Sequence, residues 1–112
     1  MANFQNITAA RLGQTALTTT VATIYTTPAL TKTYVKHIDI ANTTNGSLDL
    51  NVYIVPAGGT AGTANAILYT VAVAQHTTYQ WRGVQIMNAG DTLQAKGSST
   101  GLTLTASGGV AV

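Results

Sequence analysis

The feature that most constrains the fold is an alternation of apolar and polar residues with a period of two. It is clearest from Ser47 to Val55, where the apolar members are Leu48, Leu50, Val52 and Ile54. This is the period of a β-strand, whose successive side chains point to opposite faces of a sheet. No long segment has helical periodicity, and residues that suit a pleated surface, above all Thr, are abundant. We therefore expect an all-β protein.

About eight short strands follow from this alternation and from the turn residues between them. They are expected at Gln14 to Thr19, Ala22 to Thr26, Tyr34 to Asn42, Ser47 to Val55, Ala66 to Val73, Thr77 to Trp81, Val84 to Met87, Thr92 to Lys96 and Leu102 to Ala106, with Val110 to Val112 as an extension. The first two strands are expected to pair. Asn45-Gly46 favours a tight hairpin, because both residues tolerate positive φ. The spacing predicts a single antiparallel β-sandwich that is jelly-roll-like.

The chain is expected to form one domain with a distinct N-terminal segment. Its 112 residues are enough to bury roughly two-thirds of the unfolded surface. We assign residues 14–112 to the β-sandwich and residues 1–13 to an N-terminal arm or edge segment. Phe4, Ile7 and Leu12 lie in that segment without clean alternation. It is either a partly ordered tail or edge element, or an arm whose apolar side chains contact a neighbouring subunit.

Charge is scarce in this chain. Only 7% of the residues are Asp, Glu, Lys or Arg, against about a quarter in an ordinary soluble domain. A free monomer usually stays soluble through interspersed charge. A surface of small neutral hydroxyls and amides instead suits a protein whose exterior faces identical neighbours. The composition therefore predicts a homo-oligomeric building block of an assembly.

Several function classes are disfavoured by what the chain lacks. It has no Cys, which removes disulfides and thiolate chemistry. No segment approaches the roughly 18 apolar residues of a membrane-spanning helix, and no signal peptide is recognisable at residues 1–5. The five Lys and Arg residues give a net charge of +2 but are scattered. Nucleic-acid binders carry clustered cations, so we expect neither a nucleic-acid nor a membrane partner.

No catalytic or metal-binding constellation is recognisable. Residues 97–101 read Gly-Ser-Ser-Thr-Gly, which matches the nucleophile elbow of hydrolases, but that motif requires a strand followed by a helix. Here two strand-like segments flank it. Zinc needs three or four ligands, and this chain could draw only on His37, His76, Asp39, Asp49 and Asp91; His37 and Asp39 share a strand face, but a polar solvent-side or interface face is the favoured interpretation. We expect no enzyme activity, no cofactor and no metal.

The aromatic residues allow two interpretations. They are Tyr25, Tyr34, Tyr53, Tyr69, Tyr79 and Trp81, about one per strand. Such residues pack in a core or an interface, or they form a platform for sugars. Arg82 follows Trp81 and is a candidate for a stacked cation–π contact. The candidate capsid or subunit contacts are Phe4, Ile7, Leu12, Tyr79, Trp81 and Arg82.

Three segments together resemble a known family. Val35 to Thr43 is similar to the strand ending in Asn-Thr of small β-sandwich virion proteins of tailed bacteriophages. Tyr53 to Ala61 is similar to their hydrophobic-Val-Pro-x-Gly-Gly segment, and Asn88 to Lys96 to their Ala-Gly-Asp turn and following strand. The resemblance spans roughly residues 25 to 106 and carries no catalytic residues.

The resemblance implies a structural component located in the virion after synthesis in the host cytoplasm. We expect a capsid decoration (cement) protein whose partners are the major capsid protein and copies of itself, as a homotrimer. The alternatives are a tail, neck or fibre subunit, or a lectin-like module that binds host glycans through Tyr79, Trp81 and the loop from Gly58 to Thr63.

Overall fold

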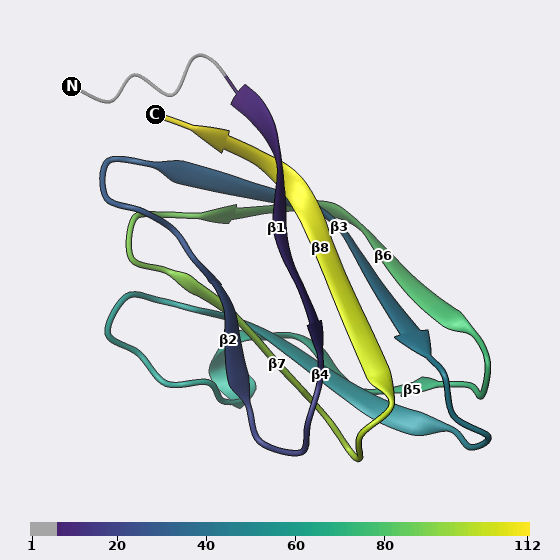
Figure 1. The fold of residues 1–112 in the computed structure, drawn as a ribbon. Helices are drawn as coiled ribbons and strands as arrows, with labels where there is room; N and C mark the ends of the chain where they lie inside the picture. The colour runs from purple at the N-terminus through teal and green to yellow at the C-terminus, as the bar shows by residue number, and fades with distance from the viewer. Residues whose placement is uncertain (1–6) are drawn as a thin grey trace.

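The computed structural model describes residues 7–112, which form eight β-strands and one short 3-10 turn (Figure 1). The elements are β1 (Ile7–Ala16), β2 (Ala22–Thr26), β3 (Lys32–Asn42), β4 (Leu48–Val55), η1 (Thr63–Asn65), β5 (Ala66–Val73), β6 (Thr78–Met87), β7 (Thr92–Gly97) and β8 (Leu102–Ala111).

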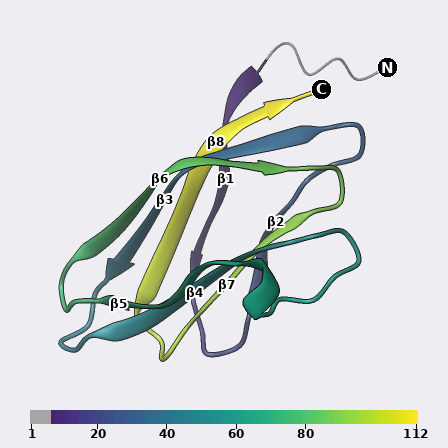
Figure 2. The same ribbon diagram turned by 180° about the vertical axis from the view of Figure 1, so that it is seen from behind.

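The strands form two antiparallel sheets of four strands each (Figures 1 and 2). Sheet A has the order β1-β8-β3-β6, and sheet B has the order β2-β7-β4-β5. The chain crosses from one sheet to the other at every connection except the one between β4 and β5. This is the arrangement of an eight-stranded jelly roll. The predicted antiparallel β-sandwich is therefore confirmed.

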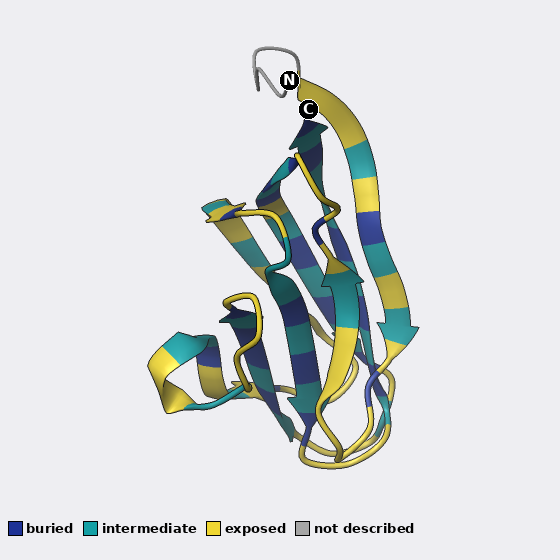
Figure 3. Ribbon diagram, turned by 90° about the vertical axis from the view of Figure 1, so that its left-hand side faces the viewer, coloured by how far each residue is buried: buried dark blue, intermediate teal, exposed yellow. Residues whose placement is uncertain are grey.

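The core lies between the inner faces of the two sheets. Ile38, Ile40 and Leu104 of sheet A and Leu50 and Leu93 of sheet B are completely buried. Buried and more exposed positions alternate along most strands, as the bands in Figure 3 show. Full burial of one such aliphatic side chain contributes about 1.5–3 kcal/mol to the stability of the fold. The apolar residues of the period-two pattern therefore hold the two sheets together.

The predicted hairpin at Asn45-Gly46 is wrong, because β3 belongs to sheet A and β4 to sheet B. A buried asparagine organises the connection instead. The side-chain amide of Asn42 donates to the carbonyl oxygens of Gly46 and Val73, both at 2.9 Å. Its Oδ1 accepts hydrogen bonds from the backbone N–H and the hydroxyl of Thr44. Asn42 thus directs the chain from β3 towards β4 and ties β3 to the end of β5.

Three further strand predictions are corrected. The first two strands do not pair, since β1 lies beside β8 in sheet A and β2 beside β7 in sheet B. The segments predicted on either side of Arg82 and Gly83 form one strand, β6, whose register with β3 shifts at that point. The last strand is also continuous through Gly108, where a Cβ atom would overlap the carbonyl oxygen of Tyr34. Glycine there permits the close approach of β8 to β3.

Candidate interaction surface

The outer face of sheet A carries a row of polar side chains that crosses all four strands. Arg11 of β1 is opposite Ser107 of β8, Ser107 is opposite His37 of β3, and His37 is opposite Arg82 of β6. Residues directly opposite in adjacent strands share a face. Ile38, next to His37, is completely buried in the core, so this central row points away from it.

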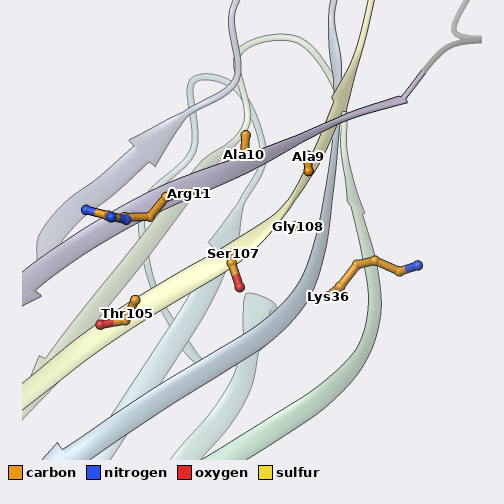
Figure 4. Close-up of a pocket in the computed structure, with 7 residues that line it drawn as sticks. All are labelled: Ala9, Ala10, Arg11, Lys36, Thr105, Ser107 and Gly108. Atoms are coloured by element: carbon orange, nitrogen blue, oxygen red, sulfur yellow. The ribbon is translucent and has the colours of Figure 1, made fainter.

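A shallow hollow of about 520 Å³ adjoins the β1 end of this row. Its lining is Ala9, Ala10, Arg11, Lys36, Thr105, Ser107 and Gly108. The small residues of β1 and β8 lie between the Arg11 and Lys36 side chains, which extend to opposite sides (Figure 4). Lys36 lies at the register shift between Val35 and His37, which adds a residue to β3 at this point. The two cations therefore border the hollow without converging on one atom.

His37 and Asp39 form a carboxylate–imidazole contact on this face. His37 Nε2 lies 2.8 Å from Asp39 Oδ1, an ion pair when the imidazole is protonated. Both atoms are shielded from solvent, and neither has another hydrogen-bond partner among residues 7–112. The carboxylate of Asp39 is therefore engaged by its neighbour on the same strand.

Exposed apolar side chains flank the central row on the side of the chain termini. Tyr34 is opposite Ile86, which is 53% exposed, and Val84 is 56% exposed. Ile7 is 59% exposed and lies opposite Ala111. An exposed apolar patch bordered by polar groups is typical of an interaction surface. The outer face of sheet A thus combines a polar row, with Arg11 and Arg82 at its two ends, and an apolar border.

The outer face of sheet B is partly covered by the chain itself. Tyr53 and Val55 are buried outside the main core, on the face opposite Val52. The loop after β4 folds back so that a Cβ atom on Gly59 would lie 3.3 Å from Val55 Cγ1, and η1 contacts β4. Burial, with a smaller contribution from Tyr69, raises the pKa of Tyr53 above its ordinary value.

The three contact residues predicted in the N-terminal segment lie in different environments. Phe4 lies outside the described residues. Residues 7–13 belong to β1, the edge strand of sheet A, and β1 continues to Ala16. Ile7 is exposed, whereas Leu12 is 5% exposed and packs in the core. Leu12 is therefore corrected from a contact residue to a core residue.

The aromatic pair of β6 also faces inward. Trp81 is opposite Ile38 and Tyr79 is opposite Ile40, and both aromatic side chains are partly buried against the core. Arg82 is exposed in the central row, on the opposite face. Adjacent residues of a strand point apart, so the expected cation–π contact between Trp81 and Arg82 is wrong.

The fold places the nucleophile-elbow match, residues 97–101, at the junction of two strands. Gly97 ends β7, residues 98–101 connect it to β8, and Ser98 Oγ accepts a hydrogen bond from the backbone N–H of Asp49. Within residues 7–112, no group of three His or carboxylate side chains is close enough to hold a metal ion. No helix in this range is long and apolar enough to cross a membrane.

Sequence reasoning missed Arg11, Lys36, His37 and Ser107 as parts of one surface. The alternation around His37 marked its outward face, but the pairing of β1 with β8 and of β8 with β3 was needed to align the row. The register shifts at Leu12 and Lys36 hide the alignment from any fixed period-two pattern.

Comparison with known families and with characterised proteins finds no match for the sequence. The fold matches a chain in the crystal structure of the T13 IBDV viral particle, with a TM-score of 0.52, 12% identity, and coverage of 98% of this chain and 31% of that chain. It also matches a chain of the infectious bursal disease virus Gx strain, with a TM-score of 0.51, 14% identity, and coverage of 98% and 32%. What these proteins share is the fold. This chain spans about a third of the length of either viral chain.

Proposed function

We propose that this protein is a non-enzymatic structural component of a virus particle. The observation that carries the proposal is that 98% of the chain matches the fold of parts of two virus chains, one of them from a viral particle. The low charge and the exposed apolar side chains on the outer face of sheet A support it, because both suit a protein that faces neighbours. A fold alone does not define function, so the proposal also depends on this surface.

Within that class we propose a capsid decoration (cement) protein of a tailed bacteriophage, located in the virion. Its partners would be the major capsid protein and two further copies of itself in a homotrimer. Contacts across capsid subunits bury surface only in the assembled state and therefore stabilise that state by mass action. An interface near 800 Å² per partner, a typical size, would be repeated over many copies.

The lectin-like alternative loses its main support. Jelly rolls also occur in lectins, so the fold does not separate the two classes. The proposed sugar platform required Tyr79 and Trp81 on an open face, yet both pack against the core. The decoration role needs an exposed face with mixed apolar and polar character, and the outer face of sheet A has that character.

Immunogold electron microscopy of purified particles tests the proposal. Antibody against this protein should label the head surface at regular positions, and the protein should be found by mass spectrometry of the same particles. Label confined to the tail or neck would overturn the decoration role and retain the virion role. Absence of the protein from purified particles would overturn both.

A further inference from the structure

The cations of the chain are concentrated on one sheet. Arg11, Lys32, Lys36 and Arg82 belong to strands of sheet A, whereas Lys96 is in β7 of sheet B. Lys32 is half-buried and its Nζ donates to Asn88 Oδ1 at 2.8 Å. The other three sheet A cations are exposed. The fold therefore gathers charges that look scattered in the sequence.

Asp39 is the one acid on the strands of sheet A, and it is paired with His37 at 2.8 Å. This face consequently presents a positive charge to a partner. Exposed Val84 and Ile86 lie on the same strand as Arg82 and add an apolar component. Arg and apolar side chains together are characteristic of protein interfaces.

A second copy of this chain has little negative charge to offer such a face. The sequence contains three acids, Asp39, Asp49 and Asp91. Both carboxylate oxygens of Asp91 accept hydrogen bonds from backbone N–H groups, Oδ1 from Ala57 and Oδ2 from Asn88. With Asp39 paired as well, Asp49 of sheet B is left as a single acid. Charge complementarity therefore requires a partner of different composition.

We propose that the outer face of sheet A binds an acidic segment of another protein, with carboxylates opposite Arg11, Lys36 and Arg82 and an apolar residue against Val84 and Ile86. This inference rests on the proposed function, since it identifies the chemistry of the particle protein to which this one attaches. The hollow beside Arg11 receives part of the segment, because its small lining residues leave room for a side chain.

A protein partner fits this face better than a nucleic acid does. Three exposed cations allow few phosphate contacts, and nucleic-acid interfaces are much more positively charged than protein interfaces. A phosphate backbone offers no favourable contact to exposed Val84 and Ile86 or to the carboxylate of Asp39. An acidic segment with apolar residues matches both components of the face.

Titration of the isolated protein with a random poly(Glu,Tyr) copolymer tests the inference independently of any particle. NMR shift changes should concentrate at the central row, and affinity should fall with added salt. The triple variant Arg11→Gln, Lys36→Gln, Arg82→Gln should bind at least tenfold more weakly. Lys96→Gln, which removes one positive charge from sheet B, should bind as the unaltered protein does.

The outcomes separate this inference from the proposed function. Absence of copolymer binding, or equal loss in Lys96→Gln, overturns the acidic-partner inference. Tighter binding of a DNA oligonucleotide of equal charge also overturns it, in favour of a nucleic-acid surface. Immunogold labelling of particles bears on the virion role and does not depend on the copolymer. A protein absent from particles that still binds the copolymer at the central row would retain this inference and lose the virion role.

Discussion

The two sheets are alike on their inner faces and different on their outer faces. Ile38 and Leu104 of sheet A are as completely buried as Leu50 and Leu93 of sheet B. On the outside, sheet B shelters Val55 under its own loop, whereas Val84 and Ile86 of sheet A remain more than half exposed. The contrast teaches that the chain covers part of one outer face itself, whereas apolar side chains on the other remain exposed.

The largest effect should come from the shared inner faces. We expect Leu104→Ala in sheet A and Leu93→Ala in sheet B each to reduce the free energy of unfolding by about 2–5 kcal/mol, because each leaves a cavity in a closed core. Urea denaturation of both variants measures this. A loss below about 1 kcal/mol in one of them would show that its sheet does not contribute equally to the core.

A matched pair of valines sharpens the contrast between the outer faces. Val55→Ala should cost about 1.5–3 kcal/mol, since it removes buried methyl groups beneath the loop at about 0.8 kcal/mol each and leaves a void. Val84→Ala makes the same chemical change on an exposed site and should stay within about 0.5 kcal/mol. Urea denaturation compares the two free energies of unfolding.

Equal losses for Val55→Ala and Val84→Ala would remove the distinction between a covered and an open outer face. Attachment to particles provides the opposite readout. Val84→Ala should weaken attachment while leaving the fold intact, whereas Val55→Ala should leave attachment unchanged in the folded fraction.

The connection between the sheets gives the next effect. Asn42→Ala removes the donor to the carbonyl oxygens of Gly46 and Val73, so we expect a loss of about 1–3 kcal/mol in the free energy of unfolding. Thermal unfolding should remain a single transition at a lower Tm. Ser47→Ala, on an exposed residue of the same connection, serves as the control and should change little. Comparable destabilisation by both variants would assign the effect to the turn as a whole.

Local pattern predicted the strands better than their partners. Ala22–Thr26 and Ala66–Val73 were expected at both of their observed ends, because alternation and turn residues act over a few positions. The sheet to which each strand belongs depends on contacts distant in sequence. At Asn45-Gly46 the hydrogen bonds of the buried Asn42 side chain outweigh the local preference for a hairpin. The central row was beyond prediction for the same reason, since Arg11 and His37 meet only through β8.

The smallest expected effect concerns pH and the covered face of sheet B. Burial raises the pKa of the Tyr53 phenol above its ordinary value of 10.0, with Tyr69 raising it further. As the pH rises past 10, the unfolded chain loses this proton before the folded chain does, so the unfolded state binds fewer protons and the free energy of unfolding falls. The stabilisation is complete below pH 10 and is lost as the pH approaches the folded-state pKa.

Urea denaturation between pH 9 and pH 11 measures this loss, and Tyr53→Phe should reduce it because no proton is released at that site. Tyr69→Phe should reduce it less, since it removes the lesser of the two causes that raise the pKa of Tyr53. An identical pH dependence in Tyr53→Phe and the unaltered protein would mean that the loop leaves Tyr53 accessible to water. In that case the outer faces of the two sheets would differ less in solvent exposure than Val55 and Val84 indicate. The outer face of sheet B would then also be a candidate partner surface.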